Sequence, residues 1–344
     1  MRQLGPRATI TVQTGPCEIF VPSARWRLKT AIIIPTHKRA ALLKRLLTDL
    51  ARAAPSPDIS VHVVENGARS GAEAICEDFA RNGGLRYRYF SQGHKSGALN
   101  FAIRNSSEDF IIFFDDDVAL PGDIVSIYVE AARRYGPGHF FGGPLIADAQ
   151  RPCPADLAPY LPLSAVGWAP SDREMVMEKD RFRYFFGANW AVFRSDLDTV
   201  GDFSEELGIT ASPRSAMGEE NDIQERLVQA GVNPVYLPGA MVRHHVPPEC
   251  YTPAWVWRRR FRLGVTDWKR TECLEQAHCR KLLGVPAWLL RAALQQKGKA
   301  VLSAILRWPG KTDIRMREAY LRGLLHGAWT TRRRRYAGRV PAKT

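Results

Sequence analysis

Strand and helix signals alternate through residues 30–134, and this alternation restricts the possible folds more than any other feature of the sequence. Short runs of apolar or alternating residues predict strands at 30–34, 60–64, 85–90 and 110–114. Segments with apolar residues at helical spacing follow these runs, at 40–53, 72–81, 97–104 and from Pro121 to about Arg134. This succession predicts an α/β fold with a mostly parallel, doubly wound sheet that binds ligands beyond the carboxyl ends of its strands.

The second half of the chain has a different texture. Five prolines between residues 152 and 170 predict loops that cross the sheet. A polar loop around Pro213 precedes a predicted helix from Glu219 to Ala230 and a strand at 234–237. Beyond Tyr251 the spacing of apolar residues predicts helices at 282–294, 299–308 and 313–330. We therefore expect a helical C-terminal extension at 265–344 and an N-terminal extension at 1–28.

Positive charge is concentrated at the C-terminal end. Residues 251–344 hold 22 Lys and Arg against 5 Asp and Glu, a net charge of +17, whereas residues 1–250 carry a net charge of −3. Such a segment could meet nucleic acid, an anionic membrane surface or a polyanionic substrate, or could be a solvated helical face. We expect a cytoplasmic protein, because the six cysteines are scattered and no segment has the apolar length of a membrane span or a secretory signal.

The triplet Asp115-Asp116-Asp117 directly follows the apolar run 110–114. Each like-charge pair at ~4 Å costs about 1 kcal/mol in water and about 4 kcal/mol at an effective dielectric of 20. A divalent cation removes that cost, and carboxylate oxygens suit Mg²⁺ or Mn²⁺. The alternative is a solvated strand end or a helix cap.

Two further motifs carry groups suited to catalysis. Glu219 and Glu220 stand at the start of the predicted helix 219–230, where carboxylates either cap the helix or act as a general base on a hydroxyl. His244 and His245 follow a predicted strand, as structural groups or as ligands of a divalent ion.

Taken together, IIIPTHKR, VVENG, SGALN, FFDDDV, GANWAVFR, GEEND and VRHH resemble the inverting family 2 glycosyltransferases of GT-A fold, over about residues 29–264. The resemblance implies a hexosyltransferase of polysaccharide biosynthesis that depends on Mn²⁺ or Mg²⁺. It would move a sugar from a nucleotide-diphospho-sugar, with a lean to UDP, to a hydroxyl of a saccharide or lipid-linked acceptor. Residues 29–144 would be the nucleotide-sugar-binding half and residues 145–264 the acceptor-binding half.

The resemblance also implies roles on the donor side. The loop after the first strand would contact the base and ribose, and Glu65 would bind the base N–H. Lys95, or its neighbour His94, would meet the diphosphate. Asp115 and Asp116 would contact the sugar or ribose, and the metal ligands would be Asp117, Asp115 and His244, with His245 as the rival of His244. The implied base and ribose contacts are Pro35, Thr36, His37 and Arg39.

On the acceptor side the resemblance makes Glu220 the catalytic base and Glu219 its neighbour at the acceptor. Asn189 and Trp190 join them as acceptor-side candidates, since an aromatic ring can stack on a sugar face. An Arg that often follows the metal-side His in that family corresponds here to Cys250.

Two other classes of protein fit parts of the sequence. A nucleotidyltransferase would also use a parallel sheet with acidic metal ligands, but the loop 35–39 lacks the glycines of a phosphate-binding loop. A nucleic-acid-binding protein would explain the basic C-terminal segment, but the run Arg332–Arg335 has no interleaved aromatic residues.

The basic helices suggest one more partner. Along 313–330, Met316, Tyr320, Leu324 and Trp329 lie roughly on one side, and the apolar stretch 282–294 is too short to span a bilayer. We expect this segment to lie on the inner leaflet of the cytoplasmic membrane. The alternative is that these apolar faces pack on the rest of the chain or form an oligomer interface.

Overall fold

The computed structural model describes residues 27–53, 57–80, 84–182, 184–208, 210, 212, 214–275, 280–282, 285–306 and 310–337. Nearly all of the predicted N-terminal extension at 1–28 lies outside the described residues.

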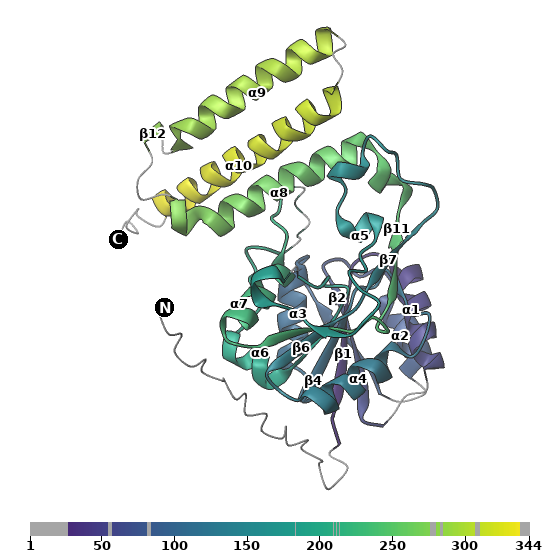
Figure 1. The fold of residues 1–344 in the computed structure, drawn as a ribbon. Coiled ribbons are helices and arrows are strands. Elements are labelled where there is room, and N and C mark those ends of the chain that lie inside the picture. Colours follow the sequence, from purple (N-terminus) through teal and green to yellow (C-terminus); the bar gives the residue numbers. More distant parts are fainter. Residues whose placement is uncertain are drawn as a thin grey trace, which may run out of the picture.

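Eight strands of the described chain form one twisted central sheet in the order β3-β2-β1-β4-β9-β6-β10-β8 (Figure 1). The strands are, in chain order, β1 (Thr30–Thr36), β2 (Ile59–Asn66), β3 (Leu85–Phe90), β4 (Phe110–Phe114), β6 (His139–Gly142), β8 (Met175–Val176), β9 (Asn189–Phe193) and β10 (Asn233–Tyr236). β1 to β4 are parallel to one another, as the alternating pattern predicts. The α/β architecture with a large central sheet and C-terminal helices, expected from the sequence, is confirmed.

One central strand departs from the predicted parallel arrangement. β9 runs antiparallel to both of its neighbours, β4 and β6. A parallel strand needs a long crossover, usually a helix that returns the chain to the same edge. The described part of 150–188 holds only short helices, namely η1 (Ala158–Tyr160), α5 (Leu163–Val166) and η2 (Lys179–Arg181). The chain therefore enters β9 from the opposite edge.

A second, three-stranded sheet stands at the carboxyl end of the central sheet. Its order is β5-β11-β7, with β5 (Val118–Ala119), β7 (Leu145–Ala149) and β11 (Val242–Val246). His244 of β11 is paired with Val118, and the His245 N–H donates to the Asp117 carbonyl at 2.8 Å. This sheet thus brings the two histidines to the aspartate triplet.

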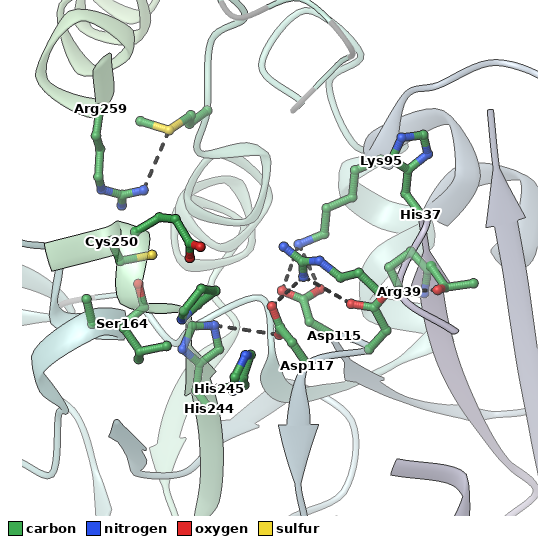
Figure 2. A pocket seen from close by; sticks show the side chains of 18 of the residues that line it. His37, Arg39, Lys95, Asp115, Asp117, Ser164, His244, His245, Cys250 and Arg259 are labelled. Carbon is green, nitrogen blue, oxygen red and sulfur yellow. Dashed lines mark hydrogen bonds and ion pairs between the residues drawn. The ribbon is translucent and has the colours of Figure 1, made fainter. Parts of the chain in front are cut away.

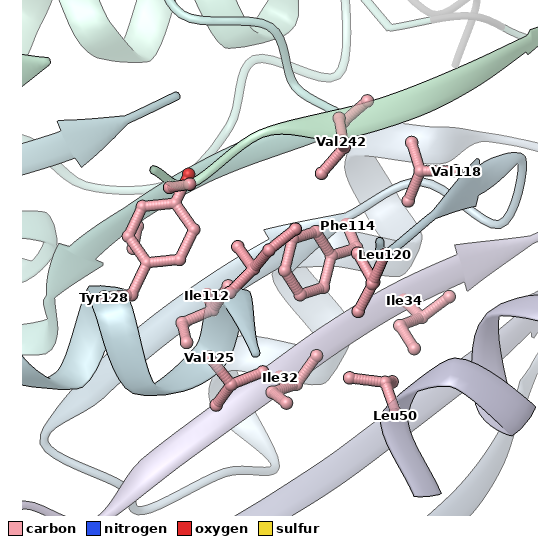
Figure 3. Close-up of a cluster of buried hydrophobic side chains, with 14 of the residues drawn as sticks. Ile32, Ile34, Leu50, Ile112, Phe114, Val118, Leu120, Val125, Tyr128 and Val242 are labelled. Carbon is pink, nitrogen blue, oxygen red and sulfur yellow. The ribbon is translucent and has the colours of Figure 1, made fainter. Parts of the chain in front are cut away.

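Helices cover both faces of the central sheet, and the buried side chains divide between the faces. α1 (Ala40–Arg52), α2 (Ala72–Ala80) and α4 (Ile124–Tyr135) pack on one face, whose core includes Ile32, Ile112 and Phe114 (Figure 3). α3 (Lys95–Arg104), α6 (Arg194–Val200) and α7 (Glu219–Gln229) pack on the other. The carboxyl ends of the strands stay uncovered by this packing.

Three long helices form a layer above the carboxyl end of the sheet. They are α8 (Pro253–Glu275), which follows η3 (Pro248–Tyr251), then α9 (Ala287–Ile305) and α10 (Lys311–Ala337). α10 lies between α8 and α9, and α9 is outermost (Figure 1). The predicted helices 282–294 and 299–308 are one helix, α9, and Leu282 belongs to the short pair β12 (Lys281–Leu282) and β13 (Val285–Pro286).

α8 and α10 touch backbone to backbone where they cross. A Cβ built on Gly264 would lie 2.1 Å from the Tyr320 carbonyl oxygen, and one on Gly323 would lie 2.0 Å from that of Phe261. Only glycine fits such an approach, since real side chains do not tolerate these distances. No helix in the described part of the chain has the length and apolar character that crossing a membrane requires.

Candidate active site

A pocket of about 530 Å³ opens at the carboxyl ends of β1 and β4, between the small sheet and α8. Nine residues predicted from the sequence line it: Pro35, Thr36, His37, Arg39, Lys95, Asp115, Asp116, Asp117 and His244. These residues come from four separate segments of the chain. The predicted edge of the sheet is therefore the edge that carries the pocket.

The aspartate triplet is held by two basic side chains (Figure 2). Arg39, at the start of α1, pairs with Asp117 and with Asp116, the latter at 3.1 Å. Lys95, at the start of α3, lies 2.9 Å from Asp115. Asp116 also accepts a hydrogen bond of 2.7 Å from the Thr36 hydroxyl. The cations offset part of the repulsion among three adjacent carboxylates.

The environment separates the proton affinities of these acids. Burial raises the pKa of Asp116 to about 6; Arg39 and Thr36 offset part of this rise, and Asp117 and Asp115 add to it. Burial also opposes the charge of Asp115, but Lys95 reverses the effect and lowers its pKa. The cations of the chain therefore do not fully neutralise the triplet, and a further positive charge bound there would reduce the remaining repulsion.

Lys95 joins the triplet to the glutamate pair at the start of α7. Its Nζ lies 3.0 Å from Glu220 Oε1 and 3.6 Å from Glu219 Oε1. Burial opposes its charge, but Asp115, Glu220 and Glu219 hold the pKa of Lys95 well above its ordinary value. Burial and the charge of Glu220 raise the pKa of Glu219. A single negative charge on the glutamate pair is therefore favoured over two.

The Glu220 carboxyl lies against a glycine. A Cβ on Gly187 would stand 2.2 Å from Glu220 Oε1, so this position must lack a side chain for Glu220 to lie there. Gly218, just before α7, has φ +93°, a left-handed conformation that favours glycine. The motifs GANWAVFR and GEEND thus meet at one point, the carboxyl group of Glu220.

Asp117 and His244 form a pair suited to a divalent ion. His244 Nε2 lies 3.6 Å from Asp117 Oδ1, and that oxygen is buried with no hydrogen-bond partner. A carboxylate oxygen and an imidazole nitrogen both suit Mn²⁺. No group of three or more His, Cys, Asp or Glu in the described chain could hold an ion by itself. Water and a ligand's phosphates would have to complete such a site.

His94 and His245 are less well placed than Lys95 and His244 for contacting the diphosphate and the metal, respectively. His94 caps α3, with its ring accepting the Gly97 N–H at 2.9 Å, so Lys95 is the residue that reaches the acids. His245 lines the pocket, but His244 is the histidine whose ring approaches Asp117. The geometry therefore favours Lys95 and His244.

Three residues predicted for the site lie elsewhere. Asn189 is buried and donates hydrogen bonds to the Pro144 and Ala240 carbonyls, and Trp190 is buried and stacks on Phe113 at 4.7 Å. Both belong to β9, and neither lines the pocket, so this geometry does not support their prediction as acceptor contacts.

Glu65 is likewise fully buried and does not line the pocket. Burial opposes its charge, but hydrogen bonds from Ser70 and Tyr87 outweigh this and lower its pKa. Its carboxylate thus has partners within the fold, and Asn66 lines the pocket instead. The prediction that Glu65 contacts the base is not supported by this geometry.

The far side of the pocket comes from residues that the sequence did not single out. Trp255 and Arg259 of α8 line it, with Ser164 and Glu249 (Figure 2). The Arg259 guanidinium lies 5.6 Å from the Trp255 ring centroid, and its Nη1 is 3.8 Å from Met217 Sδ. The available signal was three consecutive arginines, Arg258–Arg260, inside an amphipathic helix.

Comparison with known proteins identifies the family. The family model described as Glycosyl transferase family 2 matches residues 31–200, which include the aspartate triplet and Lys95. The succinoglycan biosynthesis protein ExoM of Rhizobium meliloti (strain 1021) is 27% identical over 324 residues, 93% of this chain and 92% of the relative. This chain is a family 2 glycosyltransferase. The alternatives of a nucleotidyltransferase and of a nucleic-acid-binding protein are thereby set aside.

Solved structures agree with the fold of the glycosyltransferase. The mannosyltransferase PcManGT from Pyrobaculum calidifontis, solved with GDP-Man and Mn²⁺, has a TM-score of 0.52 at 17% identity, over 96% of this chain and 81% of its own. Residues 1–349 of S. aureus TarS, solved with UDP-GlcNAc, have a TM-score of 0.53 at 14% identity, over 89% of this chain and 92% of that one. At such identities the likeness shows the GT-A fold.

Proposed function

We propose that this glycosyltransferase moves a hexose from a nucleotide-diphospho-sugar to a hydroxyl of a saccharide acceptor, with inversion and with a divalent metal. One observation carries the proposal. The aspartate triplet and Lys95 line one pocket, and Lys95 also pairs with Glu220, so acids from two distant segments meet at this one lysine. Donor and metal are further supported by the complexes of the two structural neighbours, one with GDP-Man and Mn²⁺ and one with UDP-GlcNAc.

At the donor end, the diphosphate would take over the positive charge that now pairs with acids. Lys95 and Arg39 are the cations within reach, and fixed charges in a buried site stabilise a leaving group strongly. Asp117 and His244 would hold Mn²⁺ or Mg²⁺, with Asp115 close by. When bound, the metal would act as a Lewis acid on the leaving diphosphate. His37, Thr36 and Pro35 would border the nucleoside.

At the catalytic centre, Glu220 would accept the proton of the acceptor hydroxyl. In the structure its carboxylate pairs with Lys95, and a diphosphate that draws Lys95 away would free it to act as a base. Glu219 would stay protonated, because burial and Glu220 raise its pKa. The hydroxyl oxygen would then bond to the anomeric carbon as the diphosphate leaves, a single displacement that inverts the configuration.

The acceptor would enter from the side formed by α8. Trp255 offers an aromatic face and Arg259 a cation, a pairing suited to a sugar that carries hydroxyl or acidic groups. They replace Asn189 and Trp190 as acceptor-side candidates. The name of the 27% identical relative, a succinoglycan biosynthesis protein, supports a saccharide acceptor in polysaccharide biosynthesis. Such an acceptor would be free or lipid-linked.

Three matched variants test the role of Glu220. Glu220→Gln should lower kcat by roughly 10²–10⁴-fold, the usual contribution of a general base, and leave donor affinity unchanged. Gly187→Ala should lower kcat as well, because the added methyl group displaces the Glu220 carboxyl. Glu219→Gln is the control, with a much smaller effect expected, since its carboxyl is proposed to be protonated. A crippled Glu219→Gln beside a near-normal Glu220→Gln would move the base by one residue.

The donor is best identified by thermal shift. Purified protein with Mn²⁺ would be heated with UDP-, GDP-, dTDP- and CMP-sugars in turn, each at the same concentration. A bound donor stabilises the folded state by mass action, so the matching nucleotide should give the largest rise in Tm. No rise with any of them would contradict the assignment of this pocket to a nucleotide-sugar.

A further inference from the structure

The sequence predicted an apolar face on the helix 313–330, but the structure shows a different exposed face. Met316 and Leu324 of α10 are buried in the fold, which removes most of that face as a free surface, although Trp329 stays exposed. Most of the exposed large apolar side chains in the described part of the three long helices belong instead to α9 and the residue after it: Trp288, Leu294, Val301, Leu302, Ile305 and Leu306.

α9 has two opposite faces with different surroundings. Leu289, Gln296 and Ser303 follow one another at seven-residue spacing and are buried, and Gln296 donates a hydrogen bond of 2.9 Å to the Ile314 carbonyl of α10. Leu294, Val301 and Ile305 lie on the other side, with 70%, 54% and 72% of their surface exposed. We call these three residues the outer ridge of α9. α9 is the outermost helix, so the ridge points away from the catalytic part (Figure 1).

The charge around the ridge has one sign. Residues 276–312 contain no Asp or Glu, and they carry seven basic residues: Arg280, Lys281, Arg291, Lys297, Lys299, Arg307 and Lys311. Arg291, Lys297 and Lys299 of α9 are exposed. A helix with an exposed apolar ridge flanked by basic residues and free of acids has the character of an interfacial helix.

We propose that the outer ridge of α9 binds the surface of an anionic membrane. The apolar side chains would enter the boundary between headgroups and acyl chains, and the basic residues would meet the lipid phosphates. A second copy of this chain fits less well, because a two-fold contact would bring the same acid-free basic surface against itself. Nucleic acid fits less well too, since the ridge is aliphatic and α9 offers a single ring, the exposed Trp288, on which a base could stack.

Flotation of the full chain with lipid vesicles tests this binding without any substrate, so it is independent of the proposed reaction. The protein would be mixed with vesicles of equal parts phosphatidylcholine and phosphatidylglycerol, or of phosphatidylcholine alone. We expect flotation with the anionic vesicles at low salt, little with the neutral ones, and release as salt rises. Absence of flotation with anionic vesicles at low salt would overturn the proposal.

Two triple variants separate the ridge from its charges. Leu294→Gln, Val301→Gln and Ile305→Gln together should abolish flotation while Tm stays unchanged, because all three side chains are exposed. Arg291→Gln, Lys297→Gln and Lys299→Gln together should weaken binding about a hundredfold, from roughly fivefold for each basic residue.

The control places the same apolar-to-Gln change elsewhere. Leu163 and Val176 are 49% and 50% exposed on the catalytic part, so Leu163→Gln with Val176→Gln should float like the wild type. If the ridge variant floated as well as the wild type, the ridge would not be the binding surface. A ridge variant that instead lost a concentration-dependent dimer, with no flotation of either protein, would assign the face to self-association and overturn the proposal.

Discussion

Strand β4 has a buried carboxylate near each end, and the two surroundings act on these groups in opposite directions. Glu108, just before the strand, accepts hydrogen bonds from Ser60 and from the Ser107 N–H, and His62 Nε2 lies 3.2 Å away. Burial opposes its charge, but these partners lower the pKa of Glu108 to about 2. Asp116, just after the strand, has its pKa raised by burial to about 6.

The difference shows which end of the strand is built for stability and which for binding. Burial lowers the pKa of His62, so its imidazole is neutral at pH 7. The charge of Glu108 is therefore stabilised mainly by the hydrogen bonds that its carboxylate accepts. Asp116 has two acidic neighbours and shares Arg39 with one of them. Its charge is left partly uncompensated. The uncompensated charge of Asp116 lowers the stability of the folded protein when the site is empty, and a bound cation would restore it. At Glu108, whose charge is already satisfied, a cation would bring no such gain.

The largest expected effect is on turnover. Asp117→Asn should reduce kcat by about 10³-fold or more, because it removes the carboxylate proposed to hold the metal, whose charge stabilisation amounts to several kcal/mol. Turnover would be measured with Mn²⁺, and the rise in Tm on adding Mn²⁺ with donor, expected for the wild type, should be lost in the variant. Full wild-type activity in excess EDTA would contradict the metal requirement itself.

The second effect is on stability and belongs to the other end of β4. Glu108→Gln should lower the free energy of unfolding at pH 7 by about 3 kcal/mol. A pKa that is lowered from 4.5 to about 2 in the folded state means that the ionised carboxylate stabilises that state by this amount. Urea unfolding followed by circular dichroism measures it. The exposed Glu73→Gln, which loses only a surface ion pair with Arg69, should change stability by about 0.5 kcal/mol or less. Equal losses in the two variants would remove the distinction between the clusters.

The third effect is a pH dependence of opposite sign at the two ends. The pKa of Asp116 is raised, so its ionisation costs stability above pH 6, and this cost is relieved as pH falls. Without donor or metal, the wild type should therefore gain about 1 kcal/mol relative to Asp116→Asn between pH 7 and 5. The contribution of Glu108, whose pKa is lowered, should instead be lost as pH falls from about 4.5 toward 2. Identical profiles for wild type and Asp116→Asn would show that Asp116 is an ordinary surface acid.

The sequence predicted most of the donor side of the pocket, because that side depends on local pattern. An apolar run that ends in Asp115–Asp117 is enough to place the acids at the carboxyl edge of a sheet. The same reasoning located His244 at the end of a strand, whereas Lys95 was implied by the resemblance of the SGALN segment to family 2 glycosyltransferases. All of these residues line the pocket.

The rest depends on how distant segments meet, which no local pattern contains. Trp255 and Arg259 reach the pocket only because α8 crosses the open edge of the sheet. Trp190 resembles a sugar-binding aromatic in sequence, but β9 is a central strand and the Trp190 ring packs in the core against Phe113 and Phe203. The apolar residues of 313–330 are as periodic as those of an interfacial helix, but packing in the fold buries Met316 and Leu324 and leaves Trp329 exposed.

The backbone contact between Gly264 and Gly323 limits how this enzyme can be recombined with its relatives. α8 contributes Trp255 and Arg259 to the pocket, and α10 can lie where it does only if both crossing positions lack a side chain. A chimaera that takes α9 and α10 from another glycosyltransferase must therefore bring glycine to the position facing Gly264. Without it the transplanted helices would be pushed off α8, whereas exchanging the three helices together would keep the matched pair of glycines.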